Sequence, residues 1–143
     1  MTLTAGIDAG TQSVKVVVYD DLARRVVASK SAALELFSGE DGSREQHPDA
    51  WTQAIRQCFA GIDSSVRSQI KAIAVSGQQH GFVPLDAEGE VLAPAKLWCD
   101  TSSTAECAEI TAAVGGPARC IELAGNPILT GYTASKLPWT RKH

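Results

Sequence analysis

The beginning of the chain alternates apolar and polar positions in a way that predicts three short β-strands. Because the side chains of a strand point alternately to its two faces, Val14, Val16 and Val18 are expected to share one face. The predicted strands are Leu3–Asp8, Ser13–Asp20 and Arg25–Ser31. Only short turns separate them, so the pattern predicts an antiparallel meander.

A helix and a returning strand follow in the pattern. Ser38–Gln46 is polar and contains glycines, and it is expected to be an exposed loop. After Pro48, apolar residues recur at three- and four-residue spacing, which predicts a helix with one face in the core. These residues are Trp51, Ala54, Ile55, Cys58, Phe59 and Ile62. Ile70–Ser76 is predicted to be a buried strand, and the strand–helix–strand order predicts a crossover connection.

The next stretch predicts a loop and a second hairpin. Gln78–Gly81 is the polar loop, and the turn Asp86–Gly89 separates the short apolar runs Phe82–Leu85 and Val91–Leu92. Lys96–Trp98 is expected to be extended.

Two further helices are expected in the last third of the chain. Glu106 stands three residues after Ser103, which is the spacing of a capping box, so a helix is predicted to begin there. Gly115–Pro117 is predicted to end it. A last helix is expected to begin near Thr133, although Pro138 lies inside it.

Composition and charge narrow the class of protein. The 143 residues include 13 lysines and arginines and 16 aspartates and glutamates, so the net charge is −3. A hydrophobic fraction of 44% is enough for a core, and the weak negative charge argues against binding to nucleic acid or to an anionic membrane surface. The sequence contains neither an apolar run of about 20 residues nor a signal peptide. Its four cysteines lack C-x-x-C spacing, so a cytoplasmic protein with reduced thiols is expected.

The end of the first predicted strand is the first candidate site. Asp8 precedes a turn of glycine, hydroxyl and amide residues at Gly10–Ser13. Such a turn can direct main-chain N–H groups and hydroxyls at a phosphate, and Asp8 beside it could hold Mg²⁺. The segment matches neither the P-loop nor the dinucleotide fingerprint. Two interpretations therefore stay open: a phosphate site, or a hairpin in which Gly10 merely allows a left-handed turn.

The second candidate is the polar loop after the returning strand. Gln79 and His80 lie where open α/β sheets tend to bind ligands, and their donors and acceptors suit a polyhydroxylated small molecule. A plain polar turn is the alternative. Trp98 and Asp100 are either an aromatic wall with a hydroxyl-binding carboxylate, or a buried tryptophan and an aspartate that precedes a helix.

Taken together, the motifs resemble the N-terminal part of the FGGY family of carbohydrate kinases, its xylulose-phosphorylating members most of all. The segments that carry the resemblance are Asp8–Ser13, Arg44–Trp51, Ser76–Gly81, Leu97–Asp100 and Gly131–Trp139. The resemblance implies an α/β, ribonuclease H-like (actin-like ATPase) domain: a mixed sheet with an antiparallel three-strand meander and flanking helices, incomplete at the C-terminus. Residues 1–143 would be the N-terminal part of the sugar-binding domain, without the second, ATP-binding domain.

The resemblance also implies roles for individual residues. Asp8 would be the acidic residue near the phosphates and Mg²⁺, and Gln79 and His80 would contact the sugar. Trp98 and Asp100 would lie on the sugar side. The residues implied in phosphate binding are Gly10, Thr11, Gln12, Ser13 and Lys15. The general base, an aspartate that accepts the proton of the sugar hydroxyl, is expected beyond the end of this chain.

The implied activity is ATP-dependent phosphorylation of a ketose, D-xylulose to D-xylulose 5-phosphate, by the full-length protein. ATP and Mg²⁺ would be its cofactors and a small sugar its partner. Neither nucleic acid nor a membrane is expected as a partner, and the full-length protein could form a homodimer. Ribulose, gluconate or glycerol are alternative substrates, and a non-catalytic fragment or a scaffold of the same fold are alternative functions. The isolated chain is expected to be inactive.

Overall fold

The structure is a computed structural model that describes residues 2–143. The chain forms two compact units. The first contains the described residues up to Leu36 together with His47–Gln78, and the second contains Phe37–Gln46 and Gln79–His143. Each unit is described by itself below.

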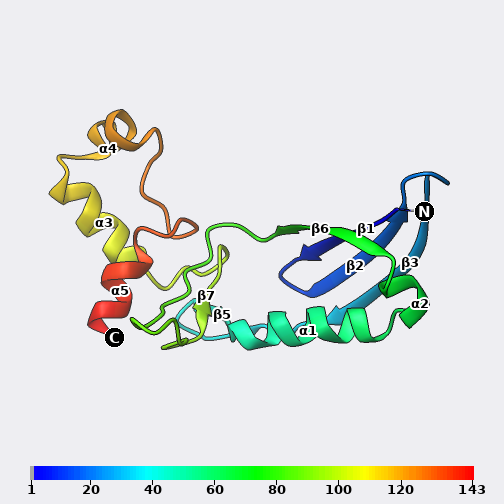
Figure 1. Ribbon diagram of the computed structural model, residues 1–143. Helices are drawn as coiled ribbons and strands as arrows, with labels where there is room; N and C mark the ends of the chain where they lie inside the picture. Colours follow the sequence, from blue (N-terminus) through cyan, green and yellow to red (C-terminus); the bar gives the residue numbers. More distant parts are fainter. Residues whose placement is uncertain (1) are drawn as a thin grey trace. The chain divides into compact units, whose positions relative to one another are not determined.

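A mixed four-stranded sheet forms the first unit, with strand order β3-β2-β1-β6. Its strands are β1 (Leu3–Ala9), β2 (Ser13–Asp20), β3 (Arg25–Ala33) and β6 (Ile70–Gly77). The first three pair antiparallel, which confirms the predicted meander, and β6 pairs parallel to β1. The crossover from β3 to β6 contains α1 (Pro48–Ala60) and the short α2 (Ser64–Arg67), and α1 runs along the sheet in Figure 1.

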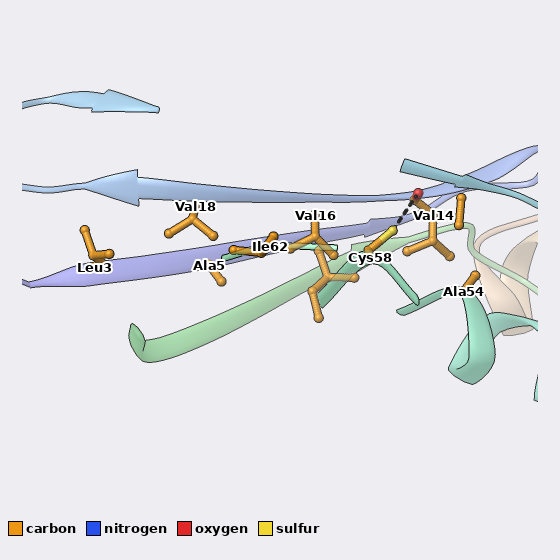
Figure 2. Close-up of a cluster of buried hydrophobic side chains, with 10 residues drawn as sticks. Leu3, Ala5, Val14, Val16, Val18, Ala54, Cys58 and Ile62 are labelled. Carbon is orange, nitrogen blue, oxygen red and sulfur yellow. Dashed lines mark hydrogen bonds between the residues drawn. The ribbon is translucent and has the colours of Figure 1, made fainter. Parts of the chain in front are cut away.

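The core of the first unit lies between α1 and one face of the sheet (Figure 2). The alternation predicted for β2 is confirmed, because Val14, Val16 and Val18 are fully buried while Lys15 is exposed. The helix contributes Ala54 and Cys58. Leu3, Ala5, Ile7, Ala32 and Ile62 complete the buried cluster. The helix begins where it was predicted to begin, with the His47 side chain accepting a hydrogen bond from the main-chain N–H of Asp49.

Strand β6 occurs where a strand was predicted, but the prediction that it is buried is wrong. Its side chains are exposed from Lys71 onward, including 57% of Ile73 and 68% of Val75. β6 is the edge strand of the sheet and α1 packs on β2 and β3, so no described helix covers it. An apolar run alone cannot tell which strands a helix covers.

The second unit contains a small three-stranded sheet in the order β4-β5-β7. Its strands are β4 (Phe37–Ser38), β5 (Arg44–Gln46) and β7 (Ala95–Lys96). The prediction of an exposed loop over Ser38–Gln46 is therefore confirmed, as a loop, only for its middle, residues 39–43, and is wrong for Arg44–Gln46, which is a strand. Ser43 and Gln46 are buried, because the returning arm of this hairpin pairs with β7, which lies far away in the sequence. The second predicted hairpin, between Phe82–Leu85 and Val91–Leu92, forms no full strands. Its two arms are joined by a single antiparallel bridge between Leu85 and Val91.

Three helices complete the second unit. They are α3 (Thr104–Ala113), α4 (Pro117–Ala124) and α5 (Lys136–Lys142). Helix α3 confirms the predicted helix, but the capping box does not form. The hydroxyl of Ser103 lies 2.9 Å from that of Ser135, and both serines are fully buried. A buried hydroxyl needs a hydrogen-bond partner, and here a distant hydroxyl supplies it in place of the helix N–H groups.

Pro117 and Pro138 both lie in the first turn of a helix, which the sequence did not predict. Pro117 does not only follow a helix end: it occupies the first turn of α4, a position where its missing N–H costs nothing. Pro138 also lies in the first turn of its helix, so α5 tolerates it. No helix among the described residues is long and apolar enough to cross a membrane.

Candidate functional site

The candidate phosphate site lies at the turn between β1 and β2, in the first unit. The main-chain N–H of Gly10 donates to the carbonyl of Ser13 over 3.0 Å, which closes the turn. The Thr11 hydroxyl donates to Oε1 of Gln78 over 3.0 Å, and the Gln78 N–H donates to the carbonyl of Ala9. The turn is thus tied to the end of β6.

Gly10 is not in a left-handed conformation, so that interpretation of the hairpin is wrong. The described glycines with positive φ lie elsewhere in the chain. A Cβ at position 10 would lie 3.3 Å from the Ser13 carbonyl oxygen, so close packing of the turn favours glycine there. Whether the turn binds phosphate stays a prediction.

Asp8, Lys15 and Ser76 lie side by side across three strands. Asp8 pairs with Lys15 in the antiparallel register and with Ser76 in the parallel register. They line a hollow of about 340 Å³ on the sheet face opposite the α1 core, together with Gly6, Ile7, Val17, Ala74 and Val75. Within residues 2–143, the exposed Asp8 carboxylate makes no hydrogen bond or ion pair with the protein.

The donor set around Asp8 fits Mg²⁺ only in company with a ligand. No group of three or more metal-ligating side chains occurs in the described part of the chain, so the protein offers Asp8 as a single carboxylate. Mg²⁺ in phosphate sites commonly keeps several waters and binds one or two carboxylates plus phosphate oxygens. Asp8, with Lys15 as a point charge for phosphate beside it, matches that requirement.

The predicted sugar residues Gln79 and His80 lie in the second unit. Both are exposed, and His80 has φ of +59°, a left-handed conformation that non-glycine residues rarely adopt. The carbonyl of His80 accepts a hydrogen bond from Lys136 Nζ over 2.9 Å and from the Thr133 hydroxyl over 3.4 Å. The imidazole stands edge-on to the ring of Tyr132, with centroids 4.9 Å apart.

Asp100 and Trp98 have opposite environments. Trp98 is 52% exposed, so the interpretation of a buried tryptophan is wrong. Asp100 is fully buried before α3, and each of its oxygens accepts hydrogen bonds from the protein. Oδ2 accepts from the Arg44 N–H and Lys96, and Oδ1 accepts from the N–H and hydroxyl of Ser102. This matches the structural alternative for Asp100, while a sugar contact for either residue stays a prediction.

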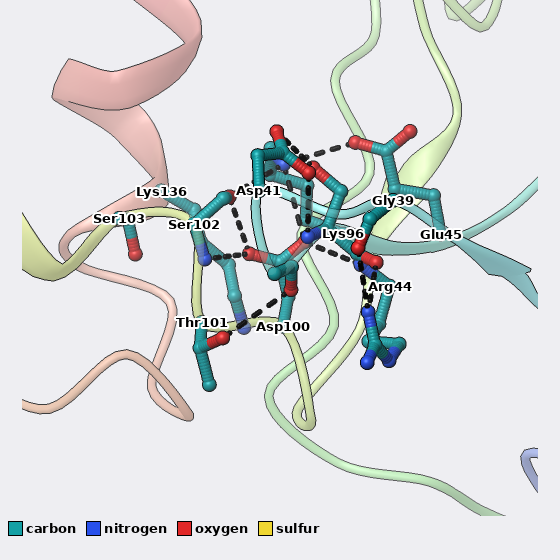
Figure 3. A network of polar contacts seen from close by, with 12 residues as sticks. Gly39, Asp41, Arg44, Glu45, Lys96, Asp100, Thr101, Ser102, Ser103 and Lys136 are labelled. Atoms are coloured by element: carbon teal, nitrogen blue, oxygen red, sulfur yellow. Dashed lines mark hydrogen bonds and ion pairs between the residues drawn. The ribbon is translucent and has the colours of Figure 1, made fainter.

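Lys96 is the centre of this polar network (Figure 3). Its ammonium is buried and lies 2.9 Å from Glu45 Oε1, 3.2 Å from Asp100 Oδ2 and 2.9 Å from the Ser102 hydroxyl. The ring of Trp139 covers it, with the centroid 3.5 Å from Nζ. Two carboxylates and a cation–π contact therefore compensate the buried charge.

Burial acts on the titratable groups of this unit in opposite directions. It raises the pKa of Asp100, but hydrogen bonds from Ser102 and Arg44 and the Lys96 charge outweigh it, so the pKa lies below its usual value. Burial lowers the pKa of Lys136, and the charge of Asp100 offsets this only in part.

Sequence reasoning missed Lys96 and assigned no role to Lys136. A lysine between Ala95 and Leu97 in an extended apolar segment is one signal of a buried charge. Lys136 lies in the motif Gly131–Trp139, which carried the resemblance without a chemical role.

The comparisons with known proteins cover nearly the whole chain. Residues 3–143 match the family described as "FGGY family of carbohydrate kinases, N-terminal domain". The xylulose kinase of Haemophilus influenzae is 38% identical over 145 residues, and that of Streptomyces coelicolor is 36% identical over 141 residues. These matches cover 96% and 99% of this chain, but only 29% of each relative.

Solved structures give the same picture. A xylulose kinase from Rhodospirillum rubrum superposes with a TM-score of 0.88 at 28% identity, covering 99% of this chain and 29% of that one. A gluconate kinase from Lactobacillus acidophilus superposes with a TM-score of 0.83 at 25% identity, covering 98% and 28%. The fold class implied by the resemblance, an actin-like α/β domain with a mixed sheet, is confirmed.

Proposed function

Because the chain belongs to the FGGY family of carbohydrate kinases, we propose that it is the N-terminal part of a kinase that phosphorylates D-xylulose with ATP. The observation that carries the substrate assignment is the 38% identity to a xylulose kinase across 96% of the chain, which includes the Gln79–His80 loop. Gluconate is the second candidate, supported by the fold likeness to a gluconate kinase at 25% identity.

In this proposal the first unit binds the phosphates of ATP. Phosphoryl transfer spreads negative charge over the transferred oxygens, so catalysis depends mainly on positioning and electrostatic stabilisation. The turn Gly10–Ser13 would supply donors, and Lys15 a positive charge. Asp8 would hold Mg²⁺, which neutralises phosphate charge when bound. The free Asp8 carboxylate beside Lys15 supports this role.

The second unit would recognise the sugar. An amide and an imidazole can both donate to and accept from hydroxyl groups, so Gln79 and His80 suit an open-chain ketose. Their exposure leaves them accessible to a small molecule. Trp98, half-exposed, would offer an apolar wall, and Asp100 would support the sugar side.

We assign the remaining parts of the reaction to chain beyond residue 143. This chain corresponds to 29% of the length of its relatives, and the proposal gives the general base and the adenosine-binding domain to the rest. Residues 1–143 alone are therefore expected neither to phosphorylate sugar nor to bind ATP tightly. The full-length protein is expected in the cytoplasm, and a homodimer is compatible with it.

The test is a coupled assay of ADP release by the full-length protein with D-xylulose, D-ribulose, gluconate and glycerol. The expected result is the highest kcat/KM for D-xylulose. His80→Ala should raise the KM for D-xylulose about fivefold or more while changing the KM for ATP little, since a lost hydrogen bond to substrate costs at least about 1 kcal/mol. His47→Ala, which alters a histidine at the start of α1, is the matched control.

Three outcomes would contradict the proposal. Absence of activity with all of these substrates would reject the sugar kinase assignment. Higher kcat/KM for gluconate would favour the second candidate. Equal loss of sugar and ATP affinity in His80→Ala would remove the sugar-recognition role from the Gln79–His80 loop.

A further inference from the structure

The segment Gly131–Lys136 contacts the Gln79–His80 loop, the candidate sugar site, at three points. Lys136 Nζ and the Thr133 hydroxyl both donate to the carbonyl oxygen of His80, and the ring of Tyr132 stands at 79° to the imidazole. All of these residues belong to the second unit. Three side chains of one short segment thus converge on the main chain and the ring of a single residue.

His80 needs such support because of its backbone conformation. At a φ of +59° a Cβ-bearing residue is strained, and such a conformation persists only where the surroundings hold it. Only one other non-glycine residue in the described chain has a positive φ, Arg24, and it lies in a turn between two strands. His80 has no such hairpin around it, and its carbonyl instead accepts two side-chain donors.

Lys136 is an unusual donor for this purpose. Its side chain is fully buried, and no carboxylate of the described residues lies within ion-pair distance of Nζ. Its hydrogen-bond acceptors are main-chain carbonyls, that of His80 at 2.9 Å and that of Gly131 at 3.4 Å. Two carbonyl acceptors and the more distant charge of Asp100 compensate this buried ammonium only in part, so stability alone does not account for a lysine at this position.

The same segment also passes close to Trp98, another of the residues predicted to lie on the sugar side. A Cβ at Gly131 would lie 3.1 Å from the carbonyl oxygen of Trp98, so only glycine allows this close passage without a shift. Gly131–Lys136 therefore contacts the main chain of His80 and passes close to that of Trp98.

We infer that Lys136 is a positioning residue for sugar recognition, which with Thr133 and Tyr132 holds the left-handed backbone and the ring orientation of His80. Its ammonium acts on the sugar only through the His80 carbonyl. The inference rests on the proposed function, because His80 has a substrate to meet only if the protein is a sugar kinase. It adds a residue to that function which neither sequence nor family likeness assigned.

The test is steady-state kinetics of the full-length protein with D-xylulose and ATP. Lys136→Met keeps the length and the apolar stem of the side chain and removes the donors. The expected result is a rise of about tenfold in the KM for D-xylulose, the fold-change that corresponds to one charge-assisted hydrogen bond, with an unchanged KM for ATP. Lys71→Met, at an exposed lysine of β6, is the control and should behave as the unmodified protein.

A double-mutant cycle separates positioning from general damage. If Lys136 acts through His80, then Lys136→Met should have no further effect on the KM for D-xylulose in a His80→Ala background. Multiplication of the two effects would overturn the inference, as would an unchanged KM in Lys136→Met. If Lys136→Met does not fold, Thr133→Val and Tyr132→Leu test the same contacts, and each should raise the KM for the sugar and not that for ATP.

A spectroscopic readout keeps the inference testable if the proposed function fails. In histidine-labelled full-length protein, the ring resonances of His80 are identified by their loss in His80→Ala. They should shift in Lys136→Met and Thr133→Val and stay in place in Lys71→Met. An inactive unmodified protein with these shifts would reject the kinase but retain the contact, whereas an active protein without them would reject the positioning role alone.

Discussion

The ammonium of Lys96 lies 3.2 Å from Oδ2 of Asp100, and neither side chain is more than 3% exposed. The two residues are four positions apart in the sequence: Lys96 ends β7, and Asp100 lies in the segment that leads from β7 to α3. Glu45 binds the same ammonium from β5, at 2.9 Å. A buried charge network therefore joins the small sheet to the start of α3 in the second unit.

Asp100→Asn should destabilise the second unit strongly. Loss of the Asp100 charge leaves the buried Lys96 ammonium with the partly exposed Glu45 as its remaining carboxylate partner, and breaking a buried ion pair costs up to about 3 kcal/mol. An amide also cannot accept all the hydrogen bonds that Arg44 and Ser102 now donate. The measurement is the free energy of unfolding in urea, followed by circular dichroism.

Glu45→Gln is the matched control for this prediction. Its side chain is 19% exposed, so water can compensate part of the loss, and the change should be clearly smaller than that of Asp100→Asn. A larger effect of Glu45→Gln would mean that Glu45, and not Asp100, is the principal partner of Lys96.

The stability that Asp100 provides should depend on pH in acid. The pKa of Asp100 in the folded chain lies below 3.8, the value for an unperturbed aspartate, because hydrogen bonds from Ser102 and Arg44 and the Lys96 charge outweigh the effect of burial. The contribution is therefore complete above about pH 3.8 and is lost as the pH falls through the lower folded pKa. The difference in unfolding free energy between the unmodified chain and Asp100→Asn should be constant from about pH 7 to pH 5 and narrow below about pH 3.8. A constant gap throughout this range would contradict the lowered pKa.

The sequence predicted the parts of the fold that depend on local patterns. The alternating valines of Ser13–Asp20 identified both the strand and its buried face, and the spacing after Pro48 identified α1. Features that depend on distant partners were missed. The pairing of Arg44–Gln46 with Ala95–Lys96 and the bond between the Ser103 and Ser135 hydroxyls join residues far apart in the chain, and no local pattern records them.

The candidate sites follow the same division. Glycine and aspartate at the end of β1 predicted a turn beside a carboxylate, because strand ends and turn residues are local signals. Lys96 and Lys136 are both buried, and a lysine in a sequence is normally expected at the surface. Only the packed structure shows that these two ammonium groups have carboxylates or carbonyls around them.

Gly77→Ala should destabilise the junction of β1 and β6. A Cβ at this position would lie 3.1 Å from the carbonyl oxygen of Ala9, an atom that is held in place because it also accepts the Gln78 N–H. Overpacking of this kind costs about 1 to 3 kcal/mol. The measurement is again urea unfolding, with Gly6→Ala in β1 as the control.

The control uses a glycine with open space around it. A Cβ at Gly6 would meet nothing within 4 Å, and Gly6 is not among the glycines with positive φ. Gly6→Ala should therefore leave stability unchanged or raise it by less than about 1 kcal/mol, since alanine reduces the freedom of the unfolded chain. If both variants lose equal stability, close contact with Ala9 is not the reason for glycine at position 77.

Asp8→Asn should separate function from stability at the candidate phosphate site. The carboxylate is exposed and makes no hydrogen bond or ion pair with the described protein, so the free energy of unfolding should change by less than about 0.5 kcal/mol. In the full-length protein, loss of this charge should lower kcat for D-xylulose phosphorylation about 100-fold, the usual scale for one electrostatic group that acts in the transition state. The KM for D-xylulose should stay unchanged, because the proposal gives Asp8 no contact with the sugar.

Asp21→Asn provides the comparison, since Asp21 is also an exposed aspartate after a strand of the same sheet but lies at the turn between β2 and β3. It should retain full activity. Full activity in Asp8→Asn would remove Asp8 from the phosphate site, and a matching loss in Asp21→Asn would point to net charge as the cause. If Asp8 holds a cation beside the phosphates, only Asp8→Asn should lose activity, and its activity should fall further at low Mg²⁺ concentration.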